Sequence, residues 1–145
     1  MVANSLSRVM VSSFVLFDTS IFIDHLRTGC HQERIETIHG LIRTSSVVLA
    51  ELWRGATKPA EADFLRALEK NHPVLTPTEK NWLESGKLLS KMCKERGFSK
   101  EKLRDLHFDV LIALTTRSHG ALLITSNRSD FELIRGYRDF HLEVW

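Results

Sequence analysis

Three carboxylates of this sequence stand in apolar surroundings where a charge is costly. Asp18 follows Phe-Val-Leu-Phe, Glu51 follows Val-Val-Leu-Ala, and Asp109 lies between Leu-His-Phe and Val-Leu-Ile. An isolated buried carboxylate costs several kcal/mol unless a cation, a hydrogen bond or protonation relieves it. Three such groups from distant segments therefore indicate one shared cation. Because cysteine and histidine are absent at ligand spacing, the pattern favours Mg²⁺ or Mn²⁺, which keep waters and bind substrate phosphates.

Each acid also has a simpler explanation. Asp18 could cap the helix that follows it, and Glu51 could face solvent and pair with a neighbouring arginine. Asp109 has the weakest alternative, because a bystander carboxylate among those neighbours would still need a partner. Two other acids fit simpler roles better: Asp105 as the cap of the helix around Asp109, and Asp24 as a solvated or ion-paired residue.

Other phosphate and nucleophile chemistries lack their motifs. The chain has no GxxxxGK[ST] loop and no GxGxxG turn, which excludes nucleotide binding through either. It also lacks the GxSxG elbow of serine hydrolases. An Asp-based phosphoryl-transfer enzyme of the haloacid dehalogenase type needs a second Asp two residues after the first, where this chain has Ser20.

Alternating strands and helices would position the acids. Apolar runs predict strands at 14–17, 41–42, 74–75 and 121–125 and a half-covered strand over 140–144, with helical patterns between them. This order predicts a three-layer α/β/α sandwich with a mostly parallel central sheet. In such sheets the functional crevice lies beyond the carboxyl ends of the strands, where Asp18 and residues 125–127 fall.

The helices carry their own boundary signals. Thr19 or Ser20 is the expected cap of the first helix, and Gly29 its end. Residues 32–39 and 48–55 are expected to be helical, and Pro59 opens a further helix. Residues 76–79 (Thr-Pro-Thr-Glu) predict a capping box for the next helix, which Gly97 ends. Its expected buried face holds Trp82, Gly86, Leu89 and Cys93, and the following helix is expected over 106–114.

The charge balance leaves nucleic acid binding open. The 145 residues carry 20 Lys and Arg against 18 Asp and Glu, a net charge of +2. Basic residues nevertheless bracket the acids. Around such a site they would contact nucleic-acid phosphates without sequence preference. These residues are Arg54, Lys58, Lys100, Lys102, Arg104 and Arg128, of which Arg54, Lys58 and Arg128 are the main candidates for the nucleic-acid backbone.

Four motifs occur in the order of a known family: Asp18-Thr19-Ser20 after an apolar strand, residues 50–55 (AELWRG), residues 108–113 (FDVLIA) and residues 125–131 (TSNRSDF). Together they resemble a PIN domain, most closely the VapC toxins of bacterial toxin–antitoxin pairs, over residues 14–145. The resemblance implies a metal-dependent endoribonuclease, often a homodimer, which a small cognate antitoxin neutralises. It also assigns Asp18, Glu51 and Asp109 as catalytic metal ligands.

The fourth acidic position of the family falls where this chain has Asn127, with Asp130 three residues later. Asp130 is the nearby source of negative charge for a second metal, although it could also cap a helix opening at Phe131. We expect Thr125, Asn127 and Ser20 to support the site or contact phosphate. The implied cofactor is thus one or two Mg²⁺ or Mn²⁺ ions.

The sequence therefore predicts an RNA-cleaving toxin with a metal-activated water, RNA as substrate and an antitoxin as partner. The alternatives are a non-catalytic PIN-like module that binds RNA or protein, and a structure-specific nuclease of the same fold. Cys30 and Cys93 read as reduced, structural residues of a cytoplasmic protein without membrane contact. The three tryptophans, Trp53, Trp82 and Trp145, are expected in the core or an interface. Residues 1–13 are expected to form a flexible extension ahead of one domain over 14–145.

Overall fold

The computed structural model describes residues 14–145, so the extension expected over residues 1–13 lies outside the described residues. Five strands form one sheet with parallel neighbours throughout, in the order β3-β2-β1-β4-β5. Val15 of β1 lies opposite Ile42 of β2 and Leu122 of β4. The strands are β1 (Phe14–Phe17), β2 (Leu41–Ser45), β3 (Val74–Leu75), β4 (Leu122–Thr125) and β5 (His141–Val144).

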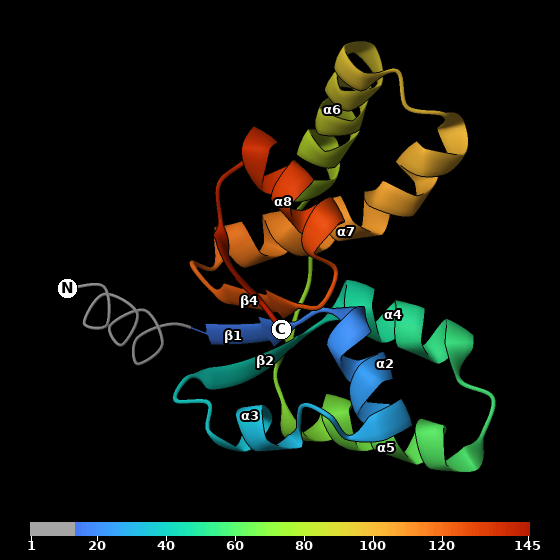
Figure 1. The fold of residues 1–145 in the computed structure, drawn as a ribbon, viewed down its shortest axis with the longest axis vertical. Coiled ribbons are helices and arrows are strands. Elements are labelled where there is room, and N and C mark those ends of the chain that lie inside the picture. Colours follow the sequence, from blue (N-terminus) through green and yellow to red (C-terminus); the bar gives the residue numbers. More distant parts are fainter. Residues whose placement is uncertain (1–13) are drawn as a thin grey trace.

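Helices cover the sheet from two sides. In Figure 1, α6, α7 and α8 lie above the strands and α2, α3 and α5 lie below them, while α4 contacts α2, α5 and α7. The predicted three-layer α/β sandwich is therefore confirmed. The helices are α2 (Thr19–Thr28), α3 (Gln32–Glu36), α4 (Ser46–Gly55), α5 (Pro59–Asn71), α6 (Glu79–Arg96), α7 (Lys100–Ser118) and α8 (Arg128–Tyr137).

The chain reverses its direction across the sheet at β1. From β1 it moves outward through β2 to β3, then returns to β4 and β5 on the other side of β1. The carboxyl ends of β1 and β4 therefore lie side by side at a topological switch point, where open α/β sheets place their sites. The backbone N–H of Asp18 donates to the Ile124 carbonyl at 2.9 Å and ties these two ends together.

The core centres on β1, β4 and α7, and buried residues of α2, α4, α5, α6 and α8 pack around them. Val15, Leu16 and Leu123 are fully buried, and so are Leu111 and Ile112 of α7. Residues 110–116 of α7 are buried without interruption, which explains why this segment is apolar on all sides. Asp109 stands directly before that stretch, at the edge of the core.

Several boundaries follow the local signals. Gly29 and Gly97 end α2 and α6 with φ angles of 66° and 65°, a left-handed conformation that favours glycine. Pro59 occupies the first position of α5, where its missing N–H costs nothing. Ser45 caps α4 by accepting hydrogen bonds from the N–H groups of Val47 and Val48, so the helix predicted there is confirmed.

The start and the buried face of α6 differ from the prediction. The capping box joins Thr78 and Asn81, and Pro77 lies before the cap. The buried residues fall one position earlier than expected and include Asn81 and Ser85, while Trp82 is 49% exposed. The face was misassigned because the two polar residues are buried through distant partners, Asn81 with Ser118 and Ser85 with His107.

Two capping predictions were also wrong. Asp18 itself caps α2, because its carboxylate accepts a hydrogen bond from the Ser20 N–H. The simpler role considered for Asp18 is therefore observed, and the expected cap at Thr19 or Ser20 is wrong. The helix that carries Asp109 begins at Lys100 with Ser99 as its cap, so Asp105 lies inside α7 and is exposed. The helix is longer than predicted because its first turn is polar, and the prediction relied on the spacing of apolar residues.

Smaller differences concern segment ends and single residues. β2 extends to Ser45 instead of ending at 42, and α3 ends at Glu36 instead of 39. Cys30 and Cys93 are unpaired as expected, but both are exposed and do not fill the core. Trp53 and Trp145 pack partly buried against the core, as expected. In residues 14–145, none of the helices has the length and apolar character needed to cross a membrane.

Candidate active site

Four acids gather from four elements at the carboxyl ends of β1 and β4. Asp18 follows β1, and Glu51 lies on α4, which begins directly after β2. Asp109 lies on α7, and Asp130 lies in the first turn of α8, which follows β4. The charges of Asp18, Glu51 and Asp130 all act on Asp109. The structure therefore brings together the four acids that the sequence predicted for one site.

Asp18 is 3% exposed and is held by hydroxyl groups. Its Oδ2 accepts hydrogen bonds from Ser20 Oγ and Thr125 Oγ1, each at 2.8 Å, in addition to the capping bond from the Ser20 N–H. All of these bonds fall on Oδ2, which leaves Oδ1 free of them. Ser20 and Thr125 thus support Asp18 and fix the direction of its carboxylate.

Glu51 is half-buried and carries a raised pKa. Burial raises the pKa of its carboxyl most strongly, and the charge of Asp18 raises it further. A hydrogen bond from Thr19 Oγ1 to Glu51 Oε1, at 2.8 Å, and the charge of Arg54 lower the pKa in part. Thr19 was expected only as a helix cap, so its contact with Glu51 is a link that the sequence analysis missed.

The carboxyl of Asp109 has a strongly raised pKa. Burial raises the pKa of its carboxyl to about 8, with further contributions from Asp18, Glu51 and Asp130, while Lys102 lowers it. At neutral pH and without an added cation, this carboxyl holds a proton. A divalent cation would relieve both the burial cost and the repulsion.

Asp130 differs from the other acids because a cation of the chain already contacts it. Lys102 Nζ lies 3.0 Å from Asp130 Oδ1, and Asn127 Nδ2 donates to Oδ2 at 3.2 Å. The Asn127 N–H donates to Thr125 Oγ1 at 2.9 Å, which joins this group to Asp18. Because α8 begins at Arg128, the alternative that Asp130 caps a helix opening at Phe131 is wrong.

A second polar group holds the loop between β4 and α8 from the side of α2. Ser126 Oγ donates to Asp24 Oδ2 at 3.0 Å, and His31 Nε2 lies 3.2 Å from the same oxygen. The Ser126 N–H donates to Ser20 Oγ at 3.1 Å. Asp24 was expected to be solvated or ion-paired, and its bond to Ser126 carried no local sequence signal because 102 residues separate them.

The predicted RNA-backbone residues lie at different places. The Arg54 guanidinium lies over the Phe108 ring, 5.7 Å from its centroid, and its charge acts on Glu51. Lys58 is exposed at the start of α5. Arg128 pairs with Glu132 at 3.1 Å and lines a hollow beside β5 instead of turning toward the acids.

The donor set fits a hard divalent cation. The four carboxylates supply oxygen ligands only, and burial, followed by the charges of neighbouring acids, raises the pKa of both Glu51 and Asp109. Within residues 14–145 no group of three or more His, Cys, Asp or Glu side chains is already arranged to hold a metal ion. The carboxylates would therefore have to move closer together around an ion.

The fold and the site together define a class of protein, an α/β sandwich with a parallel sheet and a group of acids at its switch point. The chain belongs to the PIN domain family, whose model matches residues 15–136. The resemblance drawn from the sequence motifs is thereby confirmed. No curated protein sequence matches the chain at a significant level.

Solved structures extend the likeness to the VapC type. A structure of VapBC-1 from nontypeable Haemophilus influenzae is 25% identical, with a TM-score of 0.67, and the match covers 91% of this chain and 98% of that one. VapBC2 from Rickettsia felis, bound to a promoter DNA fragment, is 22% identical, with a TM-score of 0.68 and the same coverage. DNA-bound VapBC from Salmonella typhimurium is 20% identical, with a TM-score of 0.71, covering 92% and 98%. The last two likenesses concern the fold.

Proposed function

We propose that this chain is a metal-dependent endoribonuclease that acts as the toxin of a toxin–antitoxin pair. The observation that carries the proposal is the gathering of four acids from four elements at the carboxyl ends of β1 and β4, where burial and then the charges of three neighbouring acids raise the pKa of Asp109. Such a concentration of negative charge costs stability unless it binds a cation. The PIN family match and the VapBC likenesses support the same function.

The acids are proposed to divide the work. Asp18, Glu51 and Asp109 would hold Mg²⁺ or Mn²⁺, with Asp130 as the fourth acid and the source of charge for any second ion. An ion at this place supplies a water of lowered pKa as nucleophile for the RNA phosphodiester and offsets charge on the phosphate. Ser20 and Thr125 orient Asp18 through its Oδ2.

Neighbouring side chains would bind the RNA backbone. Arg54 lies beside Phe108, within electrostatic reach of Glu51, and is exposed. Lys58 is exposed just before α5, and Arg128, exposed at the start of α8, would have to leave Glu132 to reach the RNA backbone. The Asn127 amide can donate a hydrogen bond to a phosphate oxygen. Contacts of this kind are insensitive to RNA sequence, so the target would be set by RNA shape and single-stranded access.

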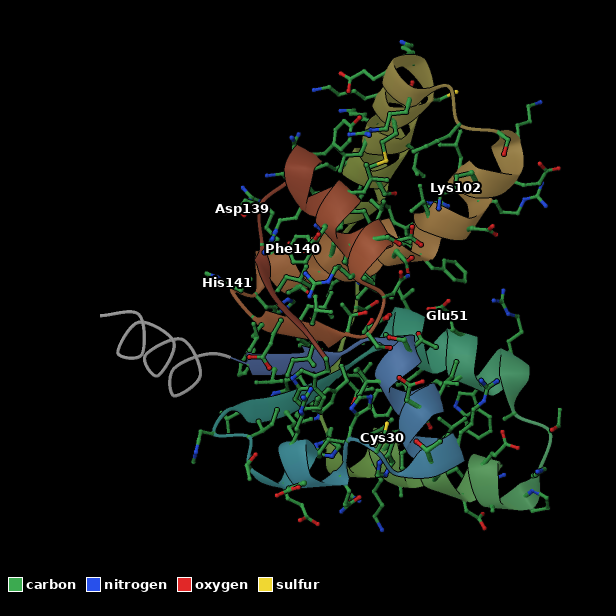
Figure 2. The ribbon with its side chains drawn as sticks, viewed as in Figure 1. Cys30, Glu51, Lys102, Asp139, Phe140 and His141 are labelled. Carbon is green, nitrogen blue, oxygen red and sulfur yellow. The ribbon has the colours of Figure 1, made fainter. Side chains whose placement is uncertain are left out.

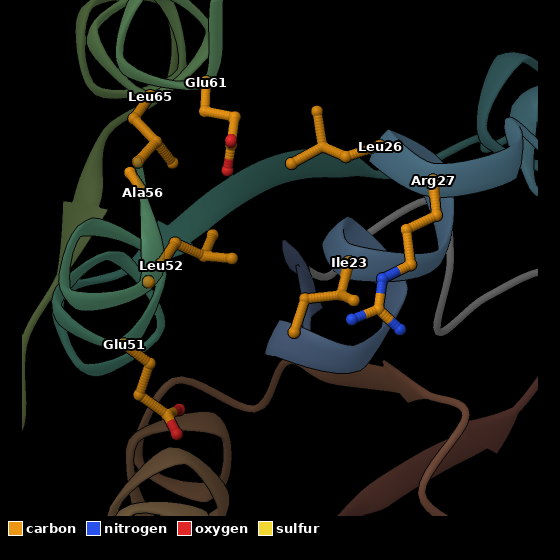
Figure 3. A pocket seen from close by; sticks show the side chains of 9 residues that line it. Ile23, Leu26, Arg27, Glu51, Leu52, Ala56, Glu61 and Leu65 are labelled. Atoms are coloured by element: carbon orange, nitrogen blue, oxygen red, sulfur yellow. The ribbon is translucent and has the colours of Figure 1, made fainter. Parts of the chain in front are cut away.

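An apolar hollow next to the acids is proposed to receive the antitoxin. It encloses about 270 Å³ and includes Glu51 in its lining. Figure 3 shows Ile23 and Leu26 of α2 facing Leu52 of α4 and Leu65 of α5. Ile23 and Leu26 are 36% and 42% exposed and lie together in the lining of this hollow. A partner helix that covered them would also shield the acids.

The remaining expectations are part of the same proposal. We expect residues 14–145 to form one nuclease domain that acts in the cytoplasm, and two copies to associate as a homodimer. The RNA substrate and the antitoxin would both approach the side on which Glu51 lies. A homodimer would leave that side accessible.

Cleavage of RNA by the purified protein tests the nuclease part of the proposal. We expect cleavage in Mg²⁺ or Mn²⁺, loss of cleavage in EDTA and recovery when excess Mg²⁺ is restored. Asp18→Asn keeps the shape of the side chain and should cost orders of magnitude in rate. Undiminished cleavage in EDTA would contradict metal dependence.

Expression in a bacterial host tests the toxin part. Wild type should arrest growth, Asp18→Ala should be harmless, and co-expression of the cognate antitoxin should restore growth to cells with wild type. If Asp18→Ala is as toxic as wild type, toxicity does not arise from the acid cluster. If wild type binds RNA but neither cleaves it nor arrests growth, the chain is a binding module instead.

A further inference from the structure

Asp130 is the one acid of the cluster with an ammonium group of the chain at hydrogen-bond distance, among the contacts of the described residues. Lys102 Nζ lies 3.0 Å from Oδ1, while Asn127 Nδ2 occupies Oδ2 at 3.2 Å, so both carboxylate oxygens have a donor. Asp18 and Glu51 receive only neutral hydroxyl and amide donors at this distance. Among these contacts, the negative charge of Asp130 is therefore paired with a cation of the chain, whereas Asp18 and Glu51 have no cation at hydrogen-bond distance.

The position of Lys102 follows from the helix that carries it. Lys102 precedes Asp109 by seven residues, close to two turns, so both lie on one face of α7. Because α7 packs against α8, this face brings Lys102 to Asp130. In Figure 2 Lys102 projects from α7 and lies above Glu51 of α4. The charge of Lys102 also acts on Asp109, so it reaches two acids of the site.

The pair is less exposed than the ion pairs Arg66–Asp63, Lys91–Glu95 and Arg128–Glu132, and about as exposed as Arg138–Glu84. The side chains of Lys102 and Asp130 are 39% and 24% exposed, against 65% and 77% for Arg66 and Asp63. A shielded pair resists screening by salt better than an exposed one. A dissolved divalent cation would have to displace the ammonium before it could use Asp130.

We propose that the Lys102 ammonium serves as the second cation of the site, in the place that a second metal ion would otherwise take at Asp130. This inference rests on the proposed nuclease function. The chain then holds one divalent ion, at Asp18, Glu51 and Asp109. The ammonium neutralises Asp130 and stands ready to contact a phosphate oxygen of the substrate.

The proposal has an unusual signature, because metal binding and cleavage should change in opposite directions. Removing the ammonium frees the Asp130 carboxylate for a second ion and removes a positive charge that repels metal. The same change takes away a group that stabilises charge on the phosphate. A lysine with a merely structural role would alter neither quantity, and a lysine that only attracts RNA would leave metal binding unchanged.

The test is Mn²⁺ binding to the RNA-free protein, measured by electron paramagnetic resonance of free Mn²⁺ and by calorimetry. Wild type should bind one Mn²⁺ per chain. Lys102→Met, which keeps the length of the side chain without its charge, should bind two. Lys102→Arg should keep one. Lys94→Met, a change at an exposed lysine of α6, should match wild type, and circular dichroism checks that each variant is folded.

The second part of the test is the rate at which the same proteins cleave RNA. Lys102→Met should cleave RNA roughly ten- to a hundredfold more slowly than wild type, and Lys102→Arg should recover most of the loss, in line with losses at groups that support a metal site. Two Mn²⁺ ions in wild type, or one in both wild type and Lys102→Met, would overturn the proposal. So would undiminished cleavage by Lys102→Met.

The two proposals can fail separately. If Mn²⁺ binding changes from one ion to two in Lys102→Met but wild type cleaves no RNA, the assignment of Lys102 stands and the nuclease function fails. If wild type cleaves RNA with metal but Lys102→Met equals it in both Mn²⁺ binding and cleavage, the nuclease function stands and the assignment of Lys102 fails. If wild type binds no Mn²⁺ at all, both proposals are overturned.

Discussion

Asp109 shows how placing a residue in the site can lower the stability of the metal-free protein. Its pKa is raised from 3.8 to about 8, first by burial and then by Asp18, Glu51 and Asp130. Between these two values the folded protein binds a proton that the unfolded chain releases. Stability of the metal-free protein therefore falls as pH rises through this window, because the unfolded state binds fewer protons. The raised pKa of Glu51 acts in the same direction.

Asp109→Asn should remove most of this pH dependence. The amide is neutral at every pH, so the metal-free variant should be the more stable protein at pH 8, by up to about 6 kcal/mol for a shift of about four pKa units at ~1.4 kcal/mol per unit. Near pH 4 the two proteins should differ much less. Denaturant unfolding in EDTA between pH 4 and 9 measures both profiles.

Mg²⁺ provides the control for that comparison. Added at pH 8, it should stabilise wild type more than Asp109→Asn, because only wild type offers the full set of ligands. Parallel unfolding profiles in EDTA, together with equal stabilisation by Mg²⁺, would show that Asp109 does not belong to the cation site.

At the scale of elements, the loop between β4 and α8 joins the parts of the site. Thr125 binds Asp18, Ser126 binds Asp24, and Asn127 binds both Thr125 and Asp130. Three consecutive residues thus tie the end of β4 to β1, α2 and α8. The loop fixes where a phosphate would lie relative to the acids, although it carries no acid itself.

Asn127→Ala should separate positioning from metal binding. The change removes one donor from Asp130 but leaves the Lys102 contact, so the Mg²⁺ midpoint of cleavage should stay close to that of wild type. The rate at saturating Mg²⁺ should fall roughly tenfold, because the Asn127 amide no longer faces the phosphate. Mg²⁺ titrations of the cleavage rate measure both quantities, and a shifted midpoint at an unchanged rate would make Asn127 a ligand.

The elements also show which features the sequence could predict. Strand ends and glycine helix ends depend on neighbours in the chain, so the Asp18 and Glu51 positions and the ends at Gly29 and Gly97 could be predicted, whereas the caps of α2 and α7 were predicted wrongly. The buried face of α6 could not, because Asn81 is buried through Ser118, 37 residues away. Lys102 and Asp130 are 28 residues apart, and packing of α7 on α8 alone brings them together.

For the whole molecule, topology and charge distribution matter more than total charge. A net charge of +2 conceals four acids gathered at one switch point of the sheet. The apolar surroundings of Asp18, Glu51 and Asp109 already suggested one shared cation, and the family resemblance assigned the same three acids as ligands. Asp130 was added as the nearest negative charge to the fourth position of the family. Arg128 pairs with Glu132 four residues later in α8, a contact within one helix that the i,i+4 spacing allows.

The hollow between α2, α4 and α5 gives a prediction at the same scale. Leu26→Glu places a charge on its apolar wall and should weaken the antitoxin complex, because the partner's apolar side chains would face a carboxylate. Leu83→Glu, at a leucine of α6 that is 61% exposed, is the matched control and should leave the complex intact. Calorimetric titration with the antitoxin measures both, and equal affinities would place the antitoxin elsewhere.

The central claim is that the acids converge on one catalytic cation site, and one pair of variants on α7 tests it most directly. Asp109 and Asp105 are one turn apart on the same helix, but Asp109 faces the other acids and Asp105 is exposed. Cleavage of an end-labelled RNA in saturating Mg²⁺ is measured with excess protein. Asp109→Asn should lose at least a hundredfold in rate, as expected when charge stabilisation is removed from a reaction centre, on the order of 10²–10³. Asp105→Asn should cleave at the wild-type rate. Equal rates for the two variants would contradict the account.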